Sequence, residues 1–283
     1  ETVPSVWIKN FKWPTMMDHK YSRGHVLVKS GPLTTTGASR LSAISALRSG
    51  AGAVTLSSDT NALVVNASHL TSVMLKEINN ADELSRFMKE KKIDTVIIGP
   101  GSGVNKLTKD MIIMAIKEEK SLVLDADGLT SFKKKPEELF FYLKNRKKRE
   151  NIILTPHHGE FNRLFKISNL NKIEKTNLAA NLTNSTILYK GNDTVISTPK
   201  KETLISQESS PFLATAGSGD VLAGICGSFL AQGMKSHQAA AAASWLHNEI
   251  GLENGPGFIA EDMSKFIART ISKKLKKLYE NGN

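Results

Sequence analysis

The stretch from residue 213 to residue 233 constrains the fold most, because it joins a glycine-rich turn to a long apolar run. Asp220 is the only charged residue between Glu208 and Lys235, and the apolar run starts directly after it. At helical spacing the run forms two adjacent apolar stripes, which consist of Val221, Ile225 and Phe229 and of Leu222, Cys226 and Leu230. The pattern predicts a largely buried helix around which the rest of the chain is organised.

The start of this helix has the features of an anion site. Gly217, Ser218 and Gly219 leave backbone N–H groups open to an anion, and the helix dipole adds partial positive charge. A carboxylate such as Asp220 in charge-poor surroundings is costly to desolvate, and its raised pKa suits a general base. Two interpretations stay open here: a phosphate cradle with a base beside it, or an Asp that caps the helix. The third glycine, Gly224, comes too late for a dinucleotide fingerprint, and no P-loop Gly-Lys-Ser/Thr follows.

The first third of the chain contains a βαβ unit. Residues 25–28 are expected to form a buried strand, residues 38–49 a helix and residues 53–56 the next strand. The polar turn 34–37 before this helix is either a second phosphate contact or an ordinary helix cap. Gly50 to Gly52 closes the helix.

Three later strands deliver polar or glycine-rich segments at their ends. Strand 94–98 runs into Gly99-Pro-Gly-Ser-Gly103, and strand 122–124 into Asp125 and Asp127. Ligands of open parallel sheets bind beyond the carboxyl ends of strands, so we favour function over a tight turn for the glycines. The two Asp residues either steer a cation or, more commonly, hold a loop.

The third of these strands, residues 151–154, leads to His157, His158 and Glu160. Their spacing is not that of a zinc motif, and adjacent His side chains rarely share one metal. We therefore expect no metal site here, and instead one polar contact from His157 to a substrate.

The remaining pattern completes an α/β fold. Helices are expected near residues 81–91, in the Lys-rich segment up to 149, and over 238–250 and 264–279, with a hairpin of strands 186–189 and 195–197 and an edge strand at 204–205. This order predicts a mostly parallel sheet with helices on both faces and an antiparallel hairpin at one edge. Trp7, Phe11 and Trp13 are expected to pack as an anchoring arm, and for residues 18–20 packing is favoured over ligand contact.

Composition excludes several classes of function. The 283 residues suit one large α/β domain or two small ones, and no domain boundary is visible. The net charge of +11 comes from Lys and Arg clusters without interleaved aromatic residues, which disfavours nucleic-acid binding. A single cysteine, with no signal peptide or membrane-length apolar run, favours a reducing cytoplasm and no membrane contact.

Five motifs lie in order between residues 24 and 247: G-P-G-x-G at 99–103, D-A-D at 125–127, T-P-H-x-G-E at 155–160, K-G-x-x-T at 190–194 and A-T-A-G-S-G-D-V-L-A-G at 214–224. The ordered set resembles the ribokinase-like NAD(P)H-hydrate dehydratases. Two motifs depart from that family, since its usual H-K-G is His19-Lys20-Tyr21 here and its G-G-S is Lys29-Ser30-Gly31.

The resemblance implies a single ribokinase-like domain over residues 1–283, with residues 1–23 as an arm or the remnant of a junction to an epimerase domain. It also implies repair of hydrated NADH or NADPH with ADP or ATP and Mg²⁺, commonly in a homotetramer and fused to or paired with an epimerase. The implied substrate contacts are Ala38, Gly101, Gly103, His157 and Asp220. The implied nucleotide contacts are Lys190, Gly191, Asn192, Asp193, Thr194, Gly217, Ser218 and Gly219.

In the implied reaction Asp220 takes the proton of the ring hydroxyl, whose oxygen attacks the terminal phosphate of ADP before phosphate is eliminated. Two alternatives remain: a ribokinase-like vitamin kinase, and a nucleotide-binding regulator, which Asp220 disfavours. We prefer the dehydratase, because a long dinucleotide needs several glycine-lined approaches. Those predicted are Thr36 to Ala38, Gly50 to Gly52 and Gly99 to Gly103.

Overall fold

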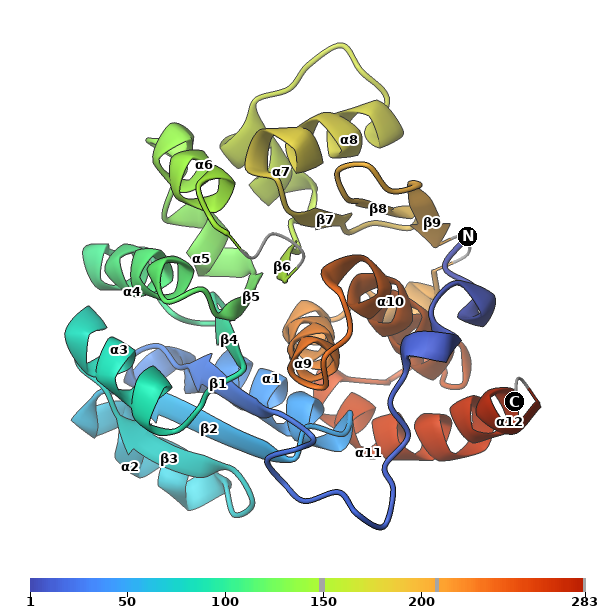
Figure 1. The fold of residues 1–283 in the computed structure, drawn as a ribbon, viewed down its shortest axis with the longest axis horizontal. Coiled ribbons are helices and arrows are strands. Elements are labelled where there is room, and N and C mark those ends of the chain that lie inside the picture. The colour runs from blue at the N-terminus through green and yellow to red at the C-terminus, as the bar shows by residue number, and fades with distance from the viewer. Residues whose placement is uncertain (148–150, 207–208, 282–283) are drawn as a thin grey trace.

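A computed structural model describes residues 1–147, 151–206 and 209–281. Within them one sheet has the strand order β3-β2-β1-β4-β5-β6-β7-β8-β9 (Figure 1). The strands are β1 (His25–Lys29), β2 (Ala53–Ser58), β3 (Met74–Glu77), β4 (Thr95–Ile98), β5 (Ser121–Leu124), β6 (Ile152–Leu154), β7 (Thr186–Tyr189), β8 (Thr194–Ser197) and β9 (Leu204–Ser206). Pairing is parallel from β3 to β7 and antiparallel from β7 to β9. The predicted parallel sheet with an antiparallel edge is confirmed.

Helices cover both faces of the sheet and separate two hydrophobic cores. They are α1 (Thr36–Arg48), α2 (Thr60–His69), α3 (Ala81–Glu90), α4 (Lys106–Lys117), α5 (Ala126–Thr130), α6 (Pro136–Lys144), α7 (His158–Phe165), α8 (Lys172–Thr183), α9 (Ser218–Ala231), α10 (Ser236–Leu252), α11 (Ala260–Thr270) and α12 (Lys276–Asn281). Side chains alternate between the faces along each strand, so Val26 and Val28 join the core under α1, α9, α10 and α11. Leu27 between them joins the core under α3 to α8.

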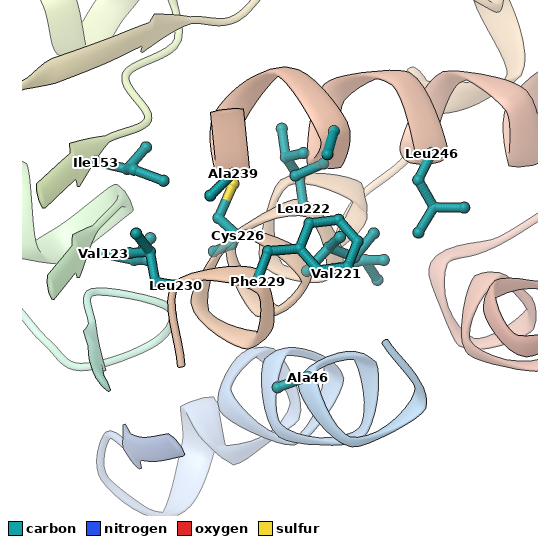
Figure 2. Close-up of a cluster of buried hydrophobic side chains, with 14 of the residues drawn as sticks. Ala46, Val123, Ile153, Val221, Leu222, Cys226, Phe229, Leu230, Ala239 and Leu246 are labelled. Carbon is teal, nitrogen blue, oxygen red and sulfur yellow. The ribbon is translucent and has the colours of Figure 1, made fainter. Parts of the chain in front are cut away.

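Helix α9 is the buried central helix that the apolar run predicts. All residues from Val221 to Ala231 are buried. Figure 2 shows this helix between Val123 and Ile153 of the sheet, Ala46 of α1 and Ala239 of α10. A Cβ atom on Gly224 would lie 2.3 Å from the carbonyl oxygen of Ser42, so a glycine lets α1 and α9 cross in close contact. The glycine-rich start of α9 is therefore positioned by a helix that is buried and closely packed against α1.

The N-terminal arm packs against this core. The ring centroids of Trp7 and Trp245 lie 5.4 Å apart, and those of Phe11 and Phe229 lie 5.7 Å apart. The predicted anchoring by aromatic residues is confirmed. The prediction that residues 18–20 pack against the core is wrong for their side chains, because these three residues are exposed. Asp18 accepts hydrogen bonds from Thr15 within its own loop instead.

Several elements differ from the sequence-based expectation, among them α2, α4, α7 and α8, which the sequence analysis did not predict. Strand β3 was not expected, because it lies at the sheet edge with largely exposed side chains and so lacks an apolar run. The last predicted helix is divided into α11, a π-helical segment (Ile271–Leu275) and α12. No helix in the described part of the chain is long and apolar enough to cross a membrane.

Candidate active site

A cavity of about 600 Å³ lies where the carboxyl ends of β5, β6 and β7 meet the start of α9. The strands deliver Asp125, His157 and Lys190 to it, each one to three residues after the strand ends. Of the predicted site residues, nine line it: His157, Lys190, Gly191, Asn192, Thr194, Gly217, Ser218, Gly219 and Asp220. The structure thus joins the second, third, fourth and fifth motifs in one cavity.

The N-terminus of α9 forms one wall of this cavity. Gly217 is the N-cap residue with φ of +87°, and a Cβ atom on it would lie 2.6 Å from Leu41 Cδ1. Because Gly217 is the N-cap residue, the interpretation of Asp220 as the cap is wrong. The N–H of Ser218 donates to the carbonyl of Thr215 at 3.3 Å. The N–H groups of Gly219 and Asp220 stay available, since the first helical turn supplies them with no carbonyl acceptor.

Asp220 has the electrostatics expected of a general base. Burial, and after it the negative charge of Asp125, raise its pKa to about 7, although the ammonium of Lys190 opposes the rise. A carboxylate with a pKa near 7 accepts a proton at neutral pH more readily than an ordinary Asp does. The position therefore suits proton abstraction beside an anion-binding helix end.

Lys190 places a positive charge at the same helix end. Its Nζ lies 2.7 Å from Asp125 Oδ1 and 4.0 Å from Glu160 Oε2. Burial alone would lower the pKa of Lys190, but these two carboxylates outweigh it and raise the pKa. Nζ also lies 3.2 Å from where a Cβ atom of Gly219 would stand. The ammonium thus faces the open N–H groups of α9.

His157 has a structural role that the sequence analysis did not foresee. It is the N-cap of α7, where its Nδ1 accepts the N–H of Gly159 at 2.9 Å and Glu160 Oε2 accepts the N–H of His157 at 2.9 Å. Burial and the charge of Lys190 lower the pKa of His157, which keeps the ring neutral. The three-residue spacing to Glu160 is the capping-box signature and was the available signal. Substrate contact through His157 stays a prediction.

The residues Ala38, Gly101 and Gly103 lie beside the cavity rather than on its wall. A Cβ atom on Gly101 would stand 3.2 Å from the Cβ of Ala38, so the start of α1 and the loop after β4 are in contact. The N–H of Gly103 donates to Asp127 Oδ2 at 2.9 Å, which confirms the loop-holding role of Asp127. Helix α1 joins them to α9, because Ser42 Oγ donates to the carbonyl of Asp220 at 2.8 Å.

Two predicted contacts are placed elsewhere. Gly50 to Gly52 lies between the end of α1 and the start of β2, at the amino end of that strand, where Gly50 faces the side chain of Gln232 at the end of α9. Its predicted approach to a dinucleotide is wrong, because a segment that precedes a parallel strand lies at the amino end of that strand, away from the carboxyl ends that line the cavity. Asp193 is 65% exposed, pairs with Lys172 at 2.6 Å and lies outside the cavity wall.

Sequence reasoning missed His247, whose Nε2 lies 3.0 Å from the hydroxyl of Ser218. It also missed the loop of residues 209–215, which contributes Ser210, Leu213 and Thr215 to the wall. No motif covers His247 or residues 209–213, whereas Ala214 and Thr215 belong to the fifth motif. Within residues 1–147, 151–206 and 209–281, no three His, Cys, Asp or Glu side chains gather to hold a metal ion.

The sequence profile described as NAD(P)H-hydrate dehydratase matches residues 26–273. The chain belongs to the NAD(P)H-hydrate dehydratase family. It is 32% identical over 247 residues to the ADP-dependent (S)-NAD(P)H-hydrate dehydratase of Neisseria meningitidis, across 84% of this chain and 79% of that protein. The resemblance found in the motifs is confirmed.

The chain spans about half the length of other relatives in the family. It is 31% identical to the bifunctional NAD(P)H-hydrate repair enzyme of Coxiella burnetii, over 81% of this chain and 46% of that protein. Its fold matches the ADP/ATP-dependent NAD(P)H-hydrate dehydratase of Bacillus subtilis, co-crystallised with ATP/Mg²⁺, at a TM-score of 0.76 and 22% identity over 96% of both chains. This likeness confirms the predicted fold class.

Proposed function

We propose that the chain catalyses the ADP- or ATP-dependent dehydration of (S)-NAD(P)H-hydrate to NAD(P)H. The observation that carries the proposal is the placing of Asp220, with its pKa raised to about 7, beside the open N–H group of Gly219 and the ammonium of Lys190. The relative in Neisseria meningitidis, which this chain matches over most of its length, is named for this reaction.

The proposed chemistry has two steps. Asp220 accepts the proton of the ring hydroxyl, and the hydroxyl oxygen attacks the terminal phosphorus of ADP, so that AMP leaves. The N–H groups of Gly219 and Asp220 and the ammonium of Lys190 stabilise the charge that develops on the transferred phosphoryl group. The C–O bond of the phosphate ester then breaks as the ring nitrogen donates its lone pair, and loss of a neighbouring proton gives the dihydronicotinamide and free phosphate.

We assign the acceptor side to Ala38, Gly101, Gly103 and His157, which lie next to or on the cavity wall. The nucleotide side is assigned to the start of α9 and residues 190–194, among which Asp193 has the weakest support because it does not line the cavity and pairs with Lys172. The loop of residues 209–215 joins the nucleotide side. These assignments follow the geometry of one cavity edge, where both ligands would meet at Asp220.

Mg²⁺ fits this site as part of a metal–nucleotide complex. The described residues gather no three-ligand metal cluster, and Mg²⁺ commonly binds through one or two carboxylates together with substrate phosphates. The carboxylates that line the cavity are Asp125, Glu160 and Asp220. When bound, the ion would neutralise phosphate charge, and the residues named above would orient the nucleotide and move the proton.

A single-turnover assay on hydrated NADH or NADPH with Mg²⁺ and either nucleotide tests the proposal. We expect the near-ultraviolet absorbance of the dihydronicotinamide to return, with AMP and phosphate formed in equal amounts when ADP is the donor. If a vitamin alcohol instead yields a stable phosphate ester, and the hydrate regains no absorbance, the chain is a kinase.

We also propose that residues 1–283 act as one domain, in the cytoplasm, within a homotetramer that works with an epimerase. Support comes from the single buried cysteine and from the bifunctional names of several relatives. Sedimentation of the purified chain tests the tetramer, and a coupled assay with added epimerase tests whether the (R)-hydrate becomes a substrate.

A further inference from the structure

The side chain of His247 reaches the active-site cavity from a helix outside the motifs. It lies on α10, is 8% exposed and lines the cavity wall. Its Nε2 stands 3.0 Å from the hydroxyl oxygen of Ser218 and 3.0 Å from the carbonyl oxygen of the same residue. Both contacts fall on the first residue of α9, at the open end of the helix.

The carbonyl contact fixes the tautomer of the ring. A carbonyl oxygen only accepts hydrogen bonds, so the hydrogen must be on Nε2 of His247. Burial lowers the pKa of His247 to about 4, so the ring is neutral at physiological pH and Nε2 carries its only N–H. This N–H points between the two oxygens of Ser218 and is shared by them.

The shared N–H decides what the hydroxyl of Ser218 can do. Because Nε2 is a donor, the hydroxyl oxygen accepts from it, and the hydroxyl hydrogen is left to donate in another direction. The backbone N–H of Ser218 already donates to Thr215. The hydroxyl is therefore the donor that Ser218 contributes to the cavity, next to the N–H groups of Gly219 and Asp220.

We propose that His247 is a positioning residue for the anion site: its Nε2–H holds the Ser218 side chain so that the hydroxyl donates to the terminal phosphate of the bound nucleotide. The inference rests on the proposed function for the identity of the ligand. A neutral donor in this place orients the hydroxyl without adding a second charge beside Lys190, and fixed donors cost no reorganisation when charge develops on the phosphoryl group.

The test is a double-mutant cycle on ADP affinity, measured by calorimetry without any hydrate. Ser218→Ala and His247→Leu should each weaken ADP binding by about threefold to tenfold, the range expected for loss of one oriented hydrogen bond. The double variant should bind ADP with about the same affinity as the single variant that binds ADP more weakly, because both changes remove the same interaction. His247→Gln, whose amide N–H replaces Nε2–H, should restore most of the affinity and the turnover.

His25→Leu is the matched control. His25 is also buried and its Nε2 lies 2.8 Å from the hydroxyl of Thr55, away from the cavity. This variant should lower the melting temperature and leave ADP affinity unchanged. Additive losses in the cycle, or a His247→Leu variant with wild-type affinity, would overturn the inference. ADP binding that shows the coupling, with no dehydration of hydrate, would refute the proposed function and leave the role of His247 standing.

Discussion

Replacement of Asp220 by Asn separates the chemical role of the carboxylate from its cost to the fold. Burial and the charge of Asp125 raise the pKa of Asp220 from 3.8 to about 7. A rise of roughly three units at about 1.4 kcal/mol each is about 4 kcal/mol. Solvent screening of this partly exposed group reduces the figure to roughly 2 kcal/mol. Asp220→Asn should therefore stabilise the folded chain by roughly 2 kcal/mol at pH 8.

The pH dependence of this gain has a definite sign. Below about pH 4 the carboxyl is protonated in both the folded and the unfolded chain, so the two proteins differ little. Between about pH 4 and pH 7 the unfolded chain has released the proton and the folded chain has not, so the stability of the wild type falls relative to the variant. Above about pH 7 the difference is constant. Urea unfolding of both proteins from pH 5 to pH 9 measures it.

Asp220→Asn should lower turnover although it stabilises the folded chain. The variant should lose dehydration and keep ADP affinity similar or slightly higher, because a negative charge beside the phosphate is gone. Wild-type turnover should rise as the pH passes through about 7, where the carboxylate ionises. If the Asn variant is no more stable than the wild type at pH 8, or keeps most of its turnover, the argument from a desolvated base fails.

Three further predictions use other parts of the site and core. In Gly219→Val the new Cβ atom would lie 3.2 Å from Lys190 Nζ, and ADP binding measured by calorimetry should weaken at least about tenfold. Gly255→Val, whose Cβ atom would meet no other atom within 4 Å, should leave ADP binding unchanged. His157→Ala should lower the free energy of unfolding by about 1 kcal/mol through loss of the cap, and His157→Asn by less; equal losses would refute the capping role. The thiol of Cys226, whose pKa burial raises, should react with a thiol reagent only after denaturation, and prompt labelling of the native protein would contradict its burial.

The sequence predicted those elements whose local pattern and tertiary role agree. Helix α9 has an apolar pattern and is buried, and the residues that follow the carboxyl ends of β5, β6 and β7 line one cavity. Strand β3 failed this condition, because an exposed edge strand is stabilised by pairing with β2 and not by its own apolar residues. The residue types within such a strand do not indicate which strand it pairs with.

The site also contains residues that local motifs predict and residues that only tertiary packing places there. Asp220 and Lys190 were found because their motifs stand at strand and helix ends. His247 was not, since its contact with Ser218 crosses 29 positions and follows from how α10 packs on α9. Gly50 to Gly52 was misassigned for a related reason: glycines allow close approach of any backbone, and here the approaching backbone is that of Lys20, whose carbonyl oxygen would lie 1.8 Å from a Cβ on Gly52.

The tight crossing of α1 and α9 at Gly224 allows the choice of nucleotide to evolve independently of the distance between the reacting groups. The starts of these two helices carry the acceptor side and the donor side of the proposed reaction, so the distance between the reacting groups is set by a contact inside the core. The loops of residues 190–194 and 209–215, which we assign to the nucleotide side, take no part in that contact. Drift in these loops can alter the choice between ADP and ATP while the reacting distance is inherited unchanged.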